Sequence, residues 1–156
     1  YGDAVGCYQQ ALDIFRRHGN RKGEGIALGS LANVFQAQGQ YDRANKLYSK
    51  ALDISREVGD KRNEGIHLCN LGSLFRAQGQ LEPAADLFSQ ALDIQRELGS
   101  KNSEGISFGS LGVILFAQGQ YERAIEFYSR ALAIHREVGD RPNEGTNLGN
   151  LGDALL

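Results

Sequence analysis

The stretch that decides the fold is residues 28–54, LGSLANVFQAQGQYDRANKLYSKALDI. In its first part, Leu28, Leu31 and Phe35 recur three and four positions apart, which places them on one face of a helix. Gly39 follows where a left-handed residue would end that helix. The second part carries a wider apolar stripe with helical spacing, made of Ala44, Leu47, Tyr48, Ala51, Leu52 and Ile54. The stretch therefore predicts two helices, which we call helix A and helix B, joined by a short turn.

The same pattern returns along the chain with a period of 40 residues and no insertions. The string Ala-Gln-Gly-Gln stands at 37–40, 77–80 and 117–120, and Glu-Gly pairs begin at Glu24, Glu64, Glu104 and Glu144. A fixed period of this length is typical of a repeat protein. We therefore interpret residues 1–156 as a single array, with a lone helix B at 1–20, complete repeats at 21–60, 61–100 and 101–140, and a lone helix A at 141–156.

Capping residues predict where each helix begins and ends. Helix A is expected at 21–37, 61–77, 101–117 and 141–156, and helix B at 1–18, 41–58, 81–98 and 121–138. The residues after each helix B are a glycine and then a good N-cap type, namely Gly19-Asn20, Gly59-Asp60, Gly99-Ser100 and Gly139-Asp140. Pro83 and Pro142 fall in first turns, where a missing N–H costs little.

Small residues in helix A predict a close approach between helices. One column holds Ala32, Gly72, Gly112 and Gly152. A glycine inside a helix costs about 1 kcal/mol relative to alanine. We expect helix–helix packing to offset this cost, with the rings of Tyr8, Tyr48, Phe88 and Tyr128 filling the adjacent space.

Composition indicates a globular domain and excludes several partners. The formal net charge is −2, without the clustered positive charge that nucleic acids or anionic membranes require. No apolar run is long enough to span a bilayer. The two cysteines, Cys7 and Cys69, are not spaced as a disulfide framework, so we expect the cytoplasm or another reducing compartment. Since the chain contains no methionine, it is interpreted as a segment of a longer protein.

No arrangement of residues predicts catalysis, a metal site or a cofactor. His18, His67 and His135 share no metal-ligand spacing, and we expect all three to be exposed. No nucleophile–base pair and no phosphate-binding glycine loop is present. The recurring arginines and glutamates predict ion pairs across the turn from helix B to helix A, which we expect to be solvated: Arg16 with Glu24, Arg56 with Glu64, Arg96 with Glu104 and Arg136 with Glu144.

These columns resemble the tetratricopeptide repeat. The family pattern of Leu-Gly followed by an aromatic residue or Leu appears as Leu71-Gly72 with Phe75, and as Leu111-Gly112 with Leu115. Gly79, Ala84, Phe88 and Ala91 complete it, while Ala32 departs slightly from the usual glycine. The length of the unit is similar to that of kinesin light chains and of the Leu-Gly-Asn-rich modulators of heterotrimeric G proteins. The resemblance implies an all-α protein, a right-handed α-solenoid of antiparallel helix hairpins, that binds an extended peptide of a protein partner in a concave groove lined by helix A.

On helix A, the face beside the core stripe is the expected peptide-binding surface. Its candidate residues are Ile26, Asn33, Gln36, Ile66, Cys69, Asn70, Ser73, Arg76, Ile106, Ser110, Val113, Phe116, Asn150 and Asp153. The asparagines could pair with a peptide backbone, Val113 and Phe116 could anchor an apolar side chain, and Gly29, Gly109 and Gly149 would leave room for the ligand. Cys69 could alternatively be a reactive thiol. The variation between copies also fits a face that is merely free of packing constraints.

A second interpretation is that the chain assembles head to tail. It begins on a helix B and ends on a helix A, without the polar capping helices that repeat arrays usually need. The apolar residues expected to be partly bare, and hence to mediate stacking, are Leu148, Leu151, Leu155 and Leu156. The first helix B of one molecule could cover the last helix A of another.

Overall fold

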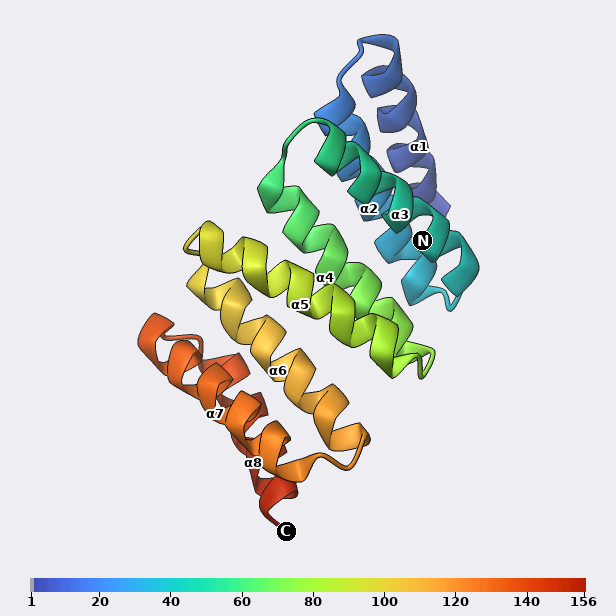
Figure 1. The fold of residues 1–156 in the computed structure, drawn as a ribbon. Helices are drawn as coiled ribbons and strands as arrows, with labels where there is room; N and C mark the ends of the chain where they lie inside the picture. Colours follow the sequence, from blue (N-terminus) through green and yellow to red (C-terminus); the bar gives the residue numbers. More distant parts are fainter. Residues whose placement is uncertain (1) are drawn as a thin grey trace. The chain divides into compact units, whose positions relative to one another are not determined.

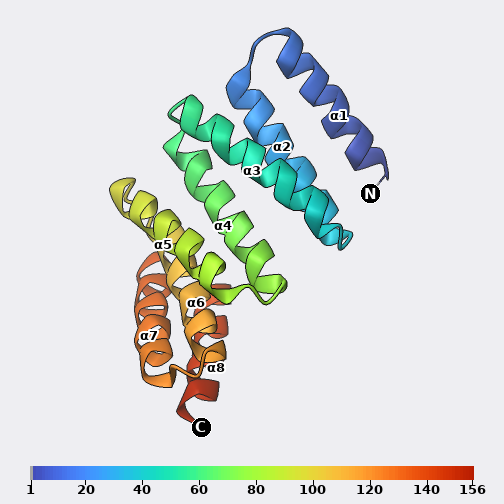
Figure 2. The same ribbon diagram turned by 45° about the vertical axis from the view of Figure 1, so that its right-hand side comes forward.

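The computed structural model describes residues 2–156, and this part of the chain is built from α-helices and short turns (Figures 1 and 2). The helices are α1 (Gly2–Arg17), α2 (Arg21–Ala37), α3 (Tyr41–Glu57), α4 (Lys61–Ala77), α5 (Leu81–Glu97), α6 (Lys101–Ala117), α7 (Tyr121–Val138) and α8 (Arg141–Leu155). The odd-numbered helices are the predicted helices B and the even-numbered ones the predicted helices A. All observed boundaries lie within one residue of the predicted ones.

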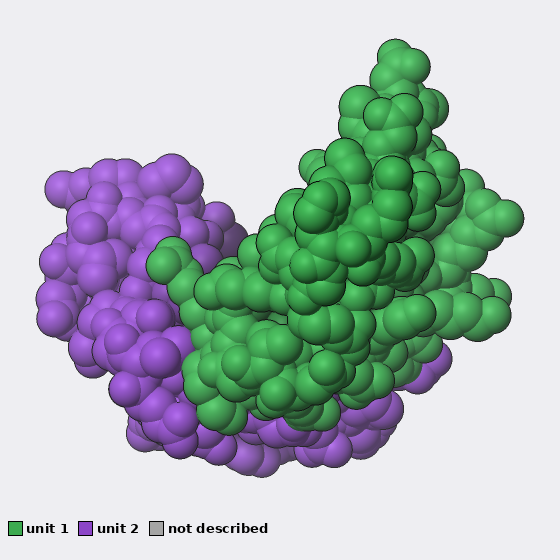
Figure 3. All heavy atoms as spheres, turned by 90° about the horizontal axis from the view of Figure 1, so that it is seen from above, with its two compact units in different colours: residues 1–78 green, residues 79–156 purple. Residues whose placement is uncertain are grey.

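The chain forms two compact units, residues 1–78 and 79–156 (Figure 3). In unit 1, α1 packs on α2, α2 on α3, and α3 on α4, and α2 also touches α4. Unit 2 repeats this order, with α5 on α6, α6 on α7, α7 on α8, and a contact between α6 and α8. Each unit thus places two successive helices A next to each other. The division of residues 1–156 into one array stays a prediction.

The turns follow the predicted capping. Gly39 ends α2 with φ of 72°, a left-handed conformation that residues with a Cβ rarely adopt. At the start of α2, the Asn20 side chain accepts a hydrogen bond from the Gly23 N–H at 2.8 Å. Asp60 and Asp140 cap α4 and α8 in the same way. Ser100 is different, because its side chain makes no capping hydrogen bond to α6.

Each unit has an apolar core between its helices. In unit 1 one core cluster is formed by Leu12, Ala27, Leu28, Leu31, Ala51 and Ile54. In unit 2, Leu115, Ala124 and Tyr128 form a core cluster against which Phe127 and Leu151 pack. A Cβ added at Gly112 would lie 2.7 Å from the Tyr128 ring. This confirms that a missing side chain on helix A lets the ring of helix B approach closely.

The glutamates of the repeated ion pairs are buried, which corrects the expectation that these pairs are solvated. Arg16 Nε lies 2.9 Å from Glu24 Oε1, and Arg21 contacts the other oxygen, while the Glu24 side chain is only 6% exposed. Burial raises the pKa of Glu24, but the hydrogen bonds from the two arginines outweigh it and leave the pKa below its ordinary value. The same geometry recurs in Arg56–Glu64, Arg96–Glu104 and Arg136–Glu144.

Two of the three histidines are buried, so the prediction that all are exposed is wrong for His67 and His135. His67 packs on Gly29 of α2, and His135 packs on Gly105 of α6. Among residues 2–156, no group hydrogen-bonds to either ring. A signal of this burial was present in the repeat, because the positions equivalent to His67 hold Ala27 and Ser107, which are small.

We expect the buried His67 to make the fold sensitive to mild acid. Burial lowers its pKa below the ordinary value of 6.5, although the Asp60 carboxylate opposes the shift. The unfolded chain therefore binds a proton that the folded chain refuses, and stability falls as the pH drops through the unfolded pKa. The melting temperature should be lower at pH 5.5 than at pH 7.5. In His67→Asn, which copies Asn147 at the equivalent position, the difference should shrink; an equal difference in both proteins would refute this assignment.

Candidate functional site

A small pocket in unit 2 brings four of the predicted peptide-binding residues together. Val113 and Phe116 of α6 form one side, Asn150 and Asp153 of α8 form the other, and Tyr128 of α7 completes it. Its volume is about 130 Å³. Both side-chain pairs are three residues apart, one helical turn, so each pair points from one face of its helix. The contact between α6 and α8 is what places the two pairs opposite each other.

Tyr128 is the pocket residue that the sequence interpretation did not include. Its side chain is almost fully buried, at 2% exposed, and its ring lies against Gly112. Phe116, at the rim, is held by an edge-to-face contact with Tyr121, with ring centroids 5.3 Å apart. Such aromatic pairs add about 0.5–1.5 kcal/mol beyond area burial. The apolar wall is therefore fixed by packing before any ligand arrives.

The pocket offers apolar and polar contacts side by side. Val113 and Phe116 can cover an aliphatic side chain, and a cavity of about 150 Å³ is known to hold a molecule the size of benzene. The Asn150 amide can donate to and accept from a peptide backbone. Asp153 is exposed and supplies a negative charge at the edge. This combination can accommodate one apolar side chain next to a polar or cationic group.

The equivalent place in unit 1 has different chemistry. There Asn33 and Gln36 of α2 replace Val113 and Phe116, and Tyr48 of α3 replaces Tyr128. The Tyr48 hydroxyl donates to the side-chain oxygens of Asn33 and of Gln36, the latter at 2.7 Å. Burial raises the pKa of Tyr48 to about 12, so the hydroxyl keeps its proton and remains a donor. On the α2 side of this place in unit 1, the side-chain oxygens of Asn33 and Gln36 thus share the Tyr48 hydroxyl as a donor.

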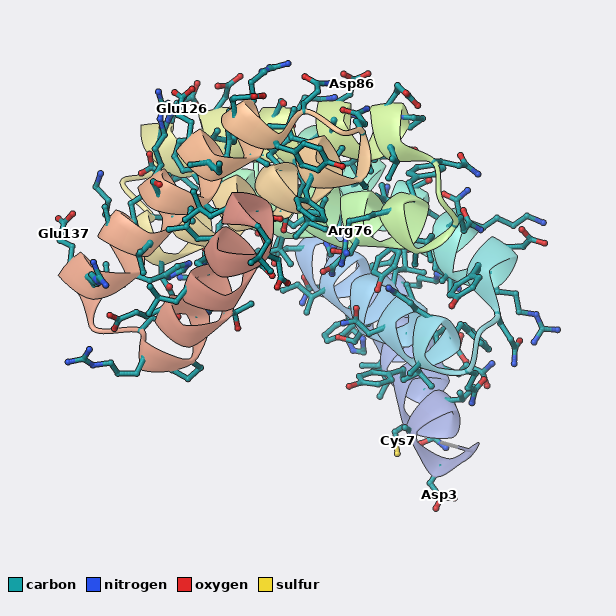
Figure 4. All side chains as sticks on the ribbon, turned by 90° about the horizontal axis from the view of Figure 1, so that it is seen from below. Asp3, Cys7, Arg76, Asp86, Glu126 and Glu137 are labelled. Atoms are coloured by element: carbon teal, nitrogen blue, oxygen red, sulfur yellow. The ribbon has the colours of Figure 1, made fainter. Side chains whose placement is uncertain are left out.

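Several predicted site residues lie outside the pocket. Ile26, Ile66 and Ile106 are 43–46% exposed. They lie nearer the N-terminus of their helices than the helix A positions that line the pocket. Arg76 is exposed on α4 (Figure 4). Asn70, Ser73, Cys69 and Ser110 are half-buried, and the Ser110 hydroxyl donates to the Ile106 carbonyl at 2.9 Å.

The expectation that glycines leave room for a ligand is wrong at two of three positions. Gly29 is covered by the His67 ring. Gly109 is covered by Asn147, whose Oδ1 would lie 2.9 Å from an added Cβ. Only at Gly149 would an added Cβ meet no atom within 4 Å. The glycines of α2 and α6 therefore serve the packing of one helix A on the next.

The residues predicted to mediate stacking are partly bare. Leu148 is 44% exposed and Leu155 is 67% exposed, and Leu156 is also exposed. Leu151 differs from them, because it packs against the core of Leu115 and Tyr128. The side of α8 that carries Leu148 and Leu155 is thus an exposed apolar surface.

A larger hollow of about 500 Å³ lies in unit 1, where α2 turns into α3. It is lined by Gly39, Gln40, Tyr41, Asp42, Arg43 and Gln78. Arg43 donates to the Gln40 side chain at 2.8 Å and lies over the Phe35 ring. Of the predicted peptide-binding and stacking residues, none lines this hollow.

Residues 2–156 contain no cluster of three His, Cys, Asp or Glu side chains that could hold a metal ion. Within the same residues, none of the helices is both long and apolar enough to cross a membrane.

Antiparallel helix hairpins with glycine turns, repeating every 40 residues, define a helical-repeat protein of all-α class. The sequence matches the tetratricopeptide repeat over residues 1–57, 23–97 and 104–156. The chain belongs to the tetratricopeptide repeat family. Members of this family generally mediate protein–protein interactions and are typically not enzymes.

Solved structures show the same fold at low sequence identity. BtubC (BKLC) from P. vanneervenii has a TM-score of 0.83 and 21% identity, over 98% of this chain and 65% of that chain. A putative kinesin light chain from Podosopora anserina with nearly identical TPR-like repeats has a TM-score of 0.77 and 22% identity, over 98% and 76%. Aspartyl phosphate phosphatase F from Bacillus subtilis has a TM-score of 0.85 and 20% identity, over 96% and 43%.

These comparisons confirm the resemblance to kinesin-light-chain-type repeats. The chain spans less than two thirds of BtubC and less than half of the phosphatase. No curated protein sequence matches the chain significantly.

Proposed function

We propose that unit 2 binds an extended peptide segment of a partner protein in the pocket formed by Val113, Phe116, Tyr128, Asn150 and Asp153. The observation that supports this most is the pocket itself, in which an apolar wall on α6 faces a polar wall on α8. At the equivalent position of unit 1, the polar side chains already bind Tyr48. Unit 2 presents Val113 and Phe116 at the positions of Asn33 and Gln36, so we assign the apolar binding site to unit 2.

The chemistry of the pocket defines the peptide. An aliphatic side chain such as Val, Leu or Ile enters between Val113 and Phe116, because about 130 Å³ admits a group of this size. A Lys or Arg beside it pairs with Asp153, and the peptide backbone hydrogen-bonds to Asn150. A single small pocket of this kind supports affinities on the order of micromolar, about −8 kcal/mol.

Selection from a randomised peptide library with the chain as bait tests this function. We expect the selected peptides to share an aliphatic residue next to a basic one. Phe116→Ala should weaken their binding about tenfold or more, as the loss of a buried aromatic anchor does, and Asp153→Lys should weaken it further by repelling the basic residue. Fluorescence anisotropy of a labelled peptide measures both effects.

The matched control is Glu137→Lys, which changes the charge equally at an exposed position on α7, away from the pocket (Figure 4). It should leave binding unchanged. The proposal fails if no peptide is selected, or if peptides bind Phe116→Ala and Asp153→Lys as tightly as the unchanged chain.

We propose self-association through the ends as a second function. It is supported by the exposure of Leu148 and Leu155 on α8, and by Gly152, where an added Cβ would meet no atom within 4 Å. At the equivalent position Gly112, the Tyr128 ring of the following helix B fills this space. A helix B from another molecule would cover α8 in the same manner.

A further inference from the structure

We propose that protonation of a buried histidine, His135, loosens the peptide pocket of unit 2, so that acid weakens peptide binding. The proposal rests on the function proposed for unit 2 and adds the regulation of that same site. Three features of the molecule support it: the enclosure of the His135 ring, its contact with α6, and the position of Tyr128 on the same face of α7.

The ring of His135 is enclosed by protein. It is completely buried, and among residues 2–156 no group hydrogen-bonds to either ring nitrogen. A neutral imidazole carries one N–H, whereas the protonated ring carries two and a positive charge. A buried charge is costly unless it is paired and hydrogen-bonded. In its present position the ring has no acceptor for the N–H that protonation adds.

Asp140 is the carboxylate that faces the ring. Its Oδ2 lies 3.9 Å from His135 Nδ1, which is beyond hydrogen-bonding distance. The same oxygen accepts a hydrogen bond from the Asn143 side chain at 2.8 Å. Asp140 therefore attracts the charged ring without satisfying it where it stands, and a direct hydrogen bond between them requires the ring to move.

The nearest carboxylates along the two helices on either side are already paired. On α6, Glu104 pairs with Arg96 of α5. On α8, Glu144 pairs with Arg136 of α7. Since arginine neutralises both carboxylates, Asp140 is the group whose charge acts on the ring.

His135 is one of two side chains of α7 that fill a glycine position on α6. Its Cε1 and Nε2 would lie 2.8 and 2.9 Å from a Cβ added at Gly105, and the Tyr128 ring would lie 2.7 Å from one added at Gly112. Both the glycines and the two rings are seven residues apart, about two helical turns, so each pair lies on one face of its helix. His135 and Tyr128 are therefore two anchor points of a single contact between α6 and α7.

The same face of α6 also receives α8 (Figure 1). Asn147 of α8 lies over Gly109, between the two glycines that α7 covers, and its Oδ1 would be 2.9 Å from an added Cβ. Side chains of α7 and α8 on this face thus set the distance of both helices from α6. The pocket has one wall on α6, the other on α8, and Tyr128 between them, so a change in this distance changes the pocket.

The equivalent place one repeat earlier shows an alternative that does not titrate. Gln95 and Ser107 occupy the positions of His135 and Asn147, and both are buried. The Ser107 hydroxyl donates to Gln95 Oε1 at 2.8 Å. The packing of the repeat therefore accepts an uncharged amide here, whereas His135 introduces a side chain whose type changes charge between pH 5 and 8.

These contacts define how a proton would act. A protonated ring has to leave Gly105 to reach water or a closer contact with Asp140. Because α7 is anchored on α6 by His135 and Tyr128 together, this movement also loosens Tyr128 and separates the walls of the pocket. Peptide binding therefore favours the neutral ring, and by reciprocity the bound peptide displaces the proton.

Peptide affinity at pH 7.5 and pH 5.5 tests the proposal, with fluorescence anisotropy of a selected peptide that contains no histidine. A histidine in water is half protonated near pH 6.5. If the protonated form cannot bind, Kd rises up to about tenfold between these two pH values, and we expect a rise of about threefold to tenfold.

Three variants identify the group that titrates. His135→Gln, which copies Gln95, should bind the peptide with the same Kd at both pH values. His18→Gln, at an exposed position of unit 1, should keep the pH dependence of the unchanged chain. His67→Asn should keep it as well, which separates the acid sensitivity of unit 1 from the effect on the pocket.

Calorimetry gives a second readout that does not depend on any variant. Peptide binding to the unchanged chain is measured at pH 6.5 in two buffers with different ionisation enthalpies. The difference between the two heats gives the number of protons exchanged. We expect a net release of protons on binding, and none from His135→Gln.

The outcomes distinguish this regulation from peptide binding itself. An equal Kd at both pH values without proton release, or a pH dependence that His135→Gln retains, would overturn the role of His135. Peptide binding that still requires Phe116 would leave the proposed function standing in either case. If no peptide binds at pH 7.5, the proposed function fails and its regulation fails with it.

Discussion

Tyr48→Ala is expected to destabilise the chain by about 3–5 kcal/mol, the cost typical of truncating a large buried aromatic side chain. Tyr48 is completely buried in unit 1 and its hydroxyl donates to Asn33 and Gln36. Truncation would leave a cavity between α2 and α3 and remove the donor that both amides share. Urea unfolding followed by circular dichroism measures the loss as a lower midpoint at unchanged slope.

Two further variants serve as controls. Tyr48→Phe tests the hydroxyl alone, and Tyr41→Ala tests the truncation of a more exposed tyrosine. Tyr48→Phe should cost only about 0.5–1.5 kcal/mol, since it keeps the ring and loses one hydrogen-bonding group. Tyr41→Ala, at a position that is 37% exposed, should stay within about 0.5 kcal/mol of the unchanged chain. If Tyr48→Ala cost no more than Tyr41→Ala, the packing described for unit 1 would be incorrect.

Gly112→Val is expected to destabilise unit 2 by about 2–3 kcal/mol through overpacking. An added Cβ would stand 2.7 Å from the ring of Tyr128, which is only 2% exposed, so the ring would have to shift out of its packed position. The same displacement would narrow the peptide pocket, since Tyr128 lines it. Stability is measured by urea unfolding, and the pocket by binding of the selected peptide.

Gly152→Val provides the matched comparison, because it makes the same change at the equivalent position of α8. An added Cβ there meets open space, so the monomer should gain a few tenths of a kcal/mol from better helix propensity. Equal destabilisation by both variants would mean that helix propensity, rather than contact with Tyr128, governs Gly112.

The helices and their ends could be predicted from the sequence because their causes are local. Apolar spacing defines one face of each helix, and a glycine in the left-handed conformation ends it. Asn20, Asp60 and Asp140 cap the following helices as their residue types indicate. Ser100 is also a good capping type, yet it makes no such bond, so residue type alone did not determine capping there.

Burial of polar groups could not be predicted, because it depends on the opposing helix. His67 lies against Gly29 and is buried, whereas His18 is exposed, although both are histidines without a metal-ligand pattern. Glu24 looked like a solvated partner of Arg16, but contacts from α1 and α2 together bury it. For the glycines the error was the reverse. The sequence suggested open space beside Gly29, but the His67 ring from the next repeat fills that space.

The candidate pocket was predicted in part. Val113, Phe116, Asn150 and Asp153 were selected because they lie beside the core stripe of helix A. The other candidates share that position without lining a pocket, and Tyr128, whose column was assigned only to packing, completes it. Which candidates converge depends on the distance between successive helices A and on the ring beneath them.

The sequence by itself determined that this chain consists of repeating helical hairpins, because each helix and turn depends on residues only a few positions apart. Only the tertiary structure decided which glycines are filled and which stay open, which histidines lose contact with water, and where a pocket remains. These properties depend on contacts between side chains of neighbouring repeats, about 40 residues apart in the sequence. Whether two such side chains touch depends on how closely the helices pack, and local sequence patterns do not determine that distance.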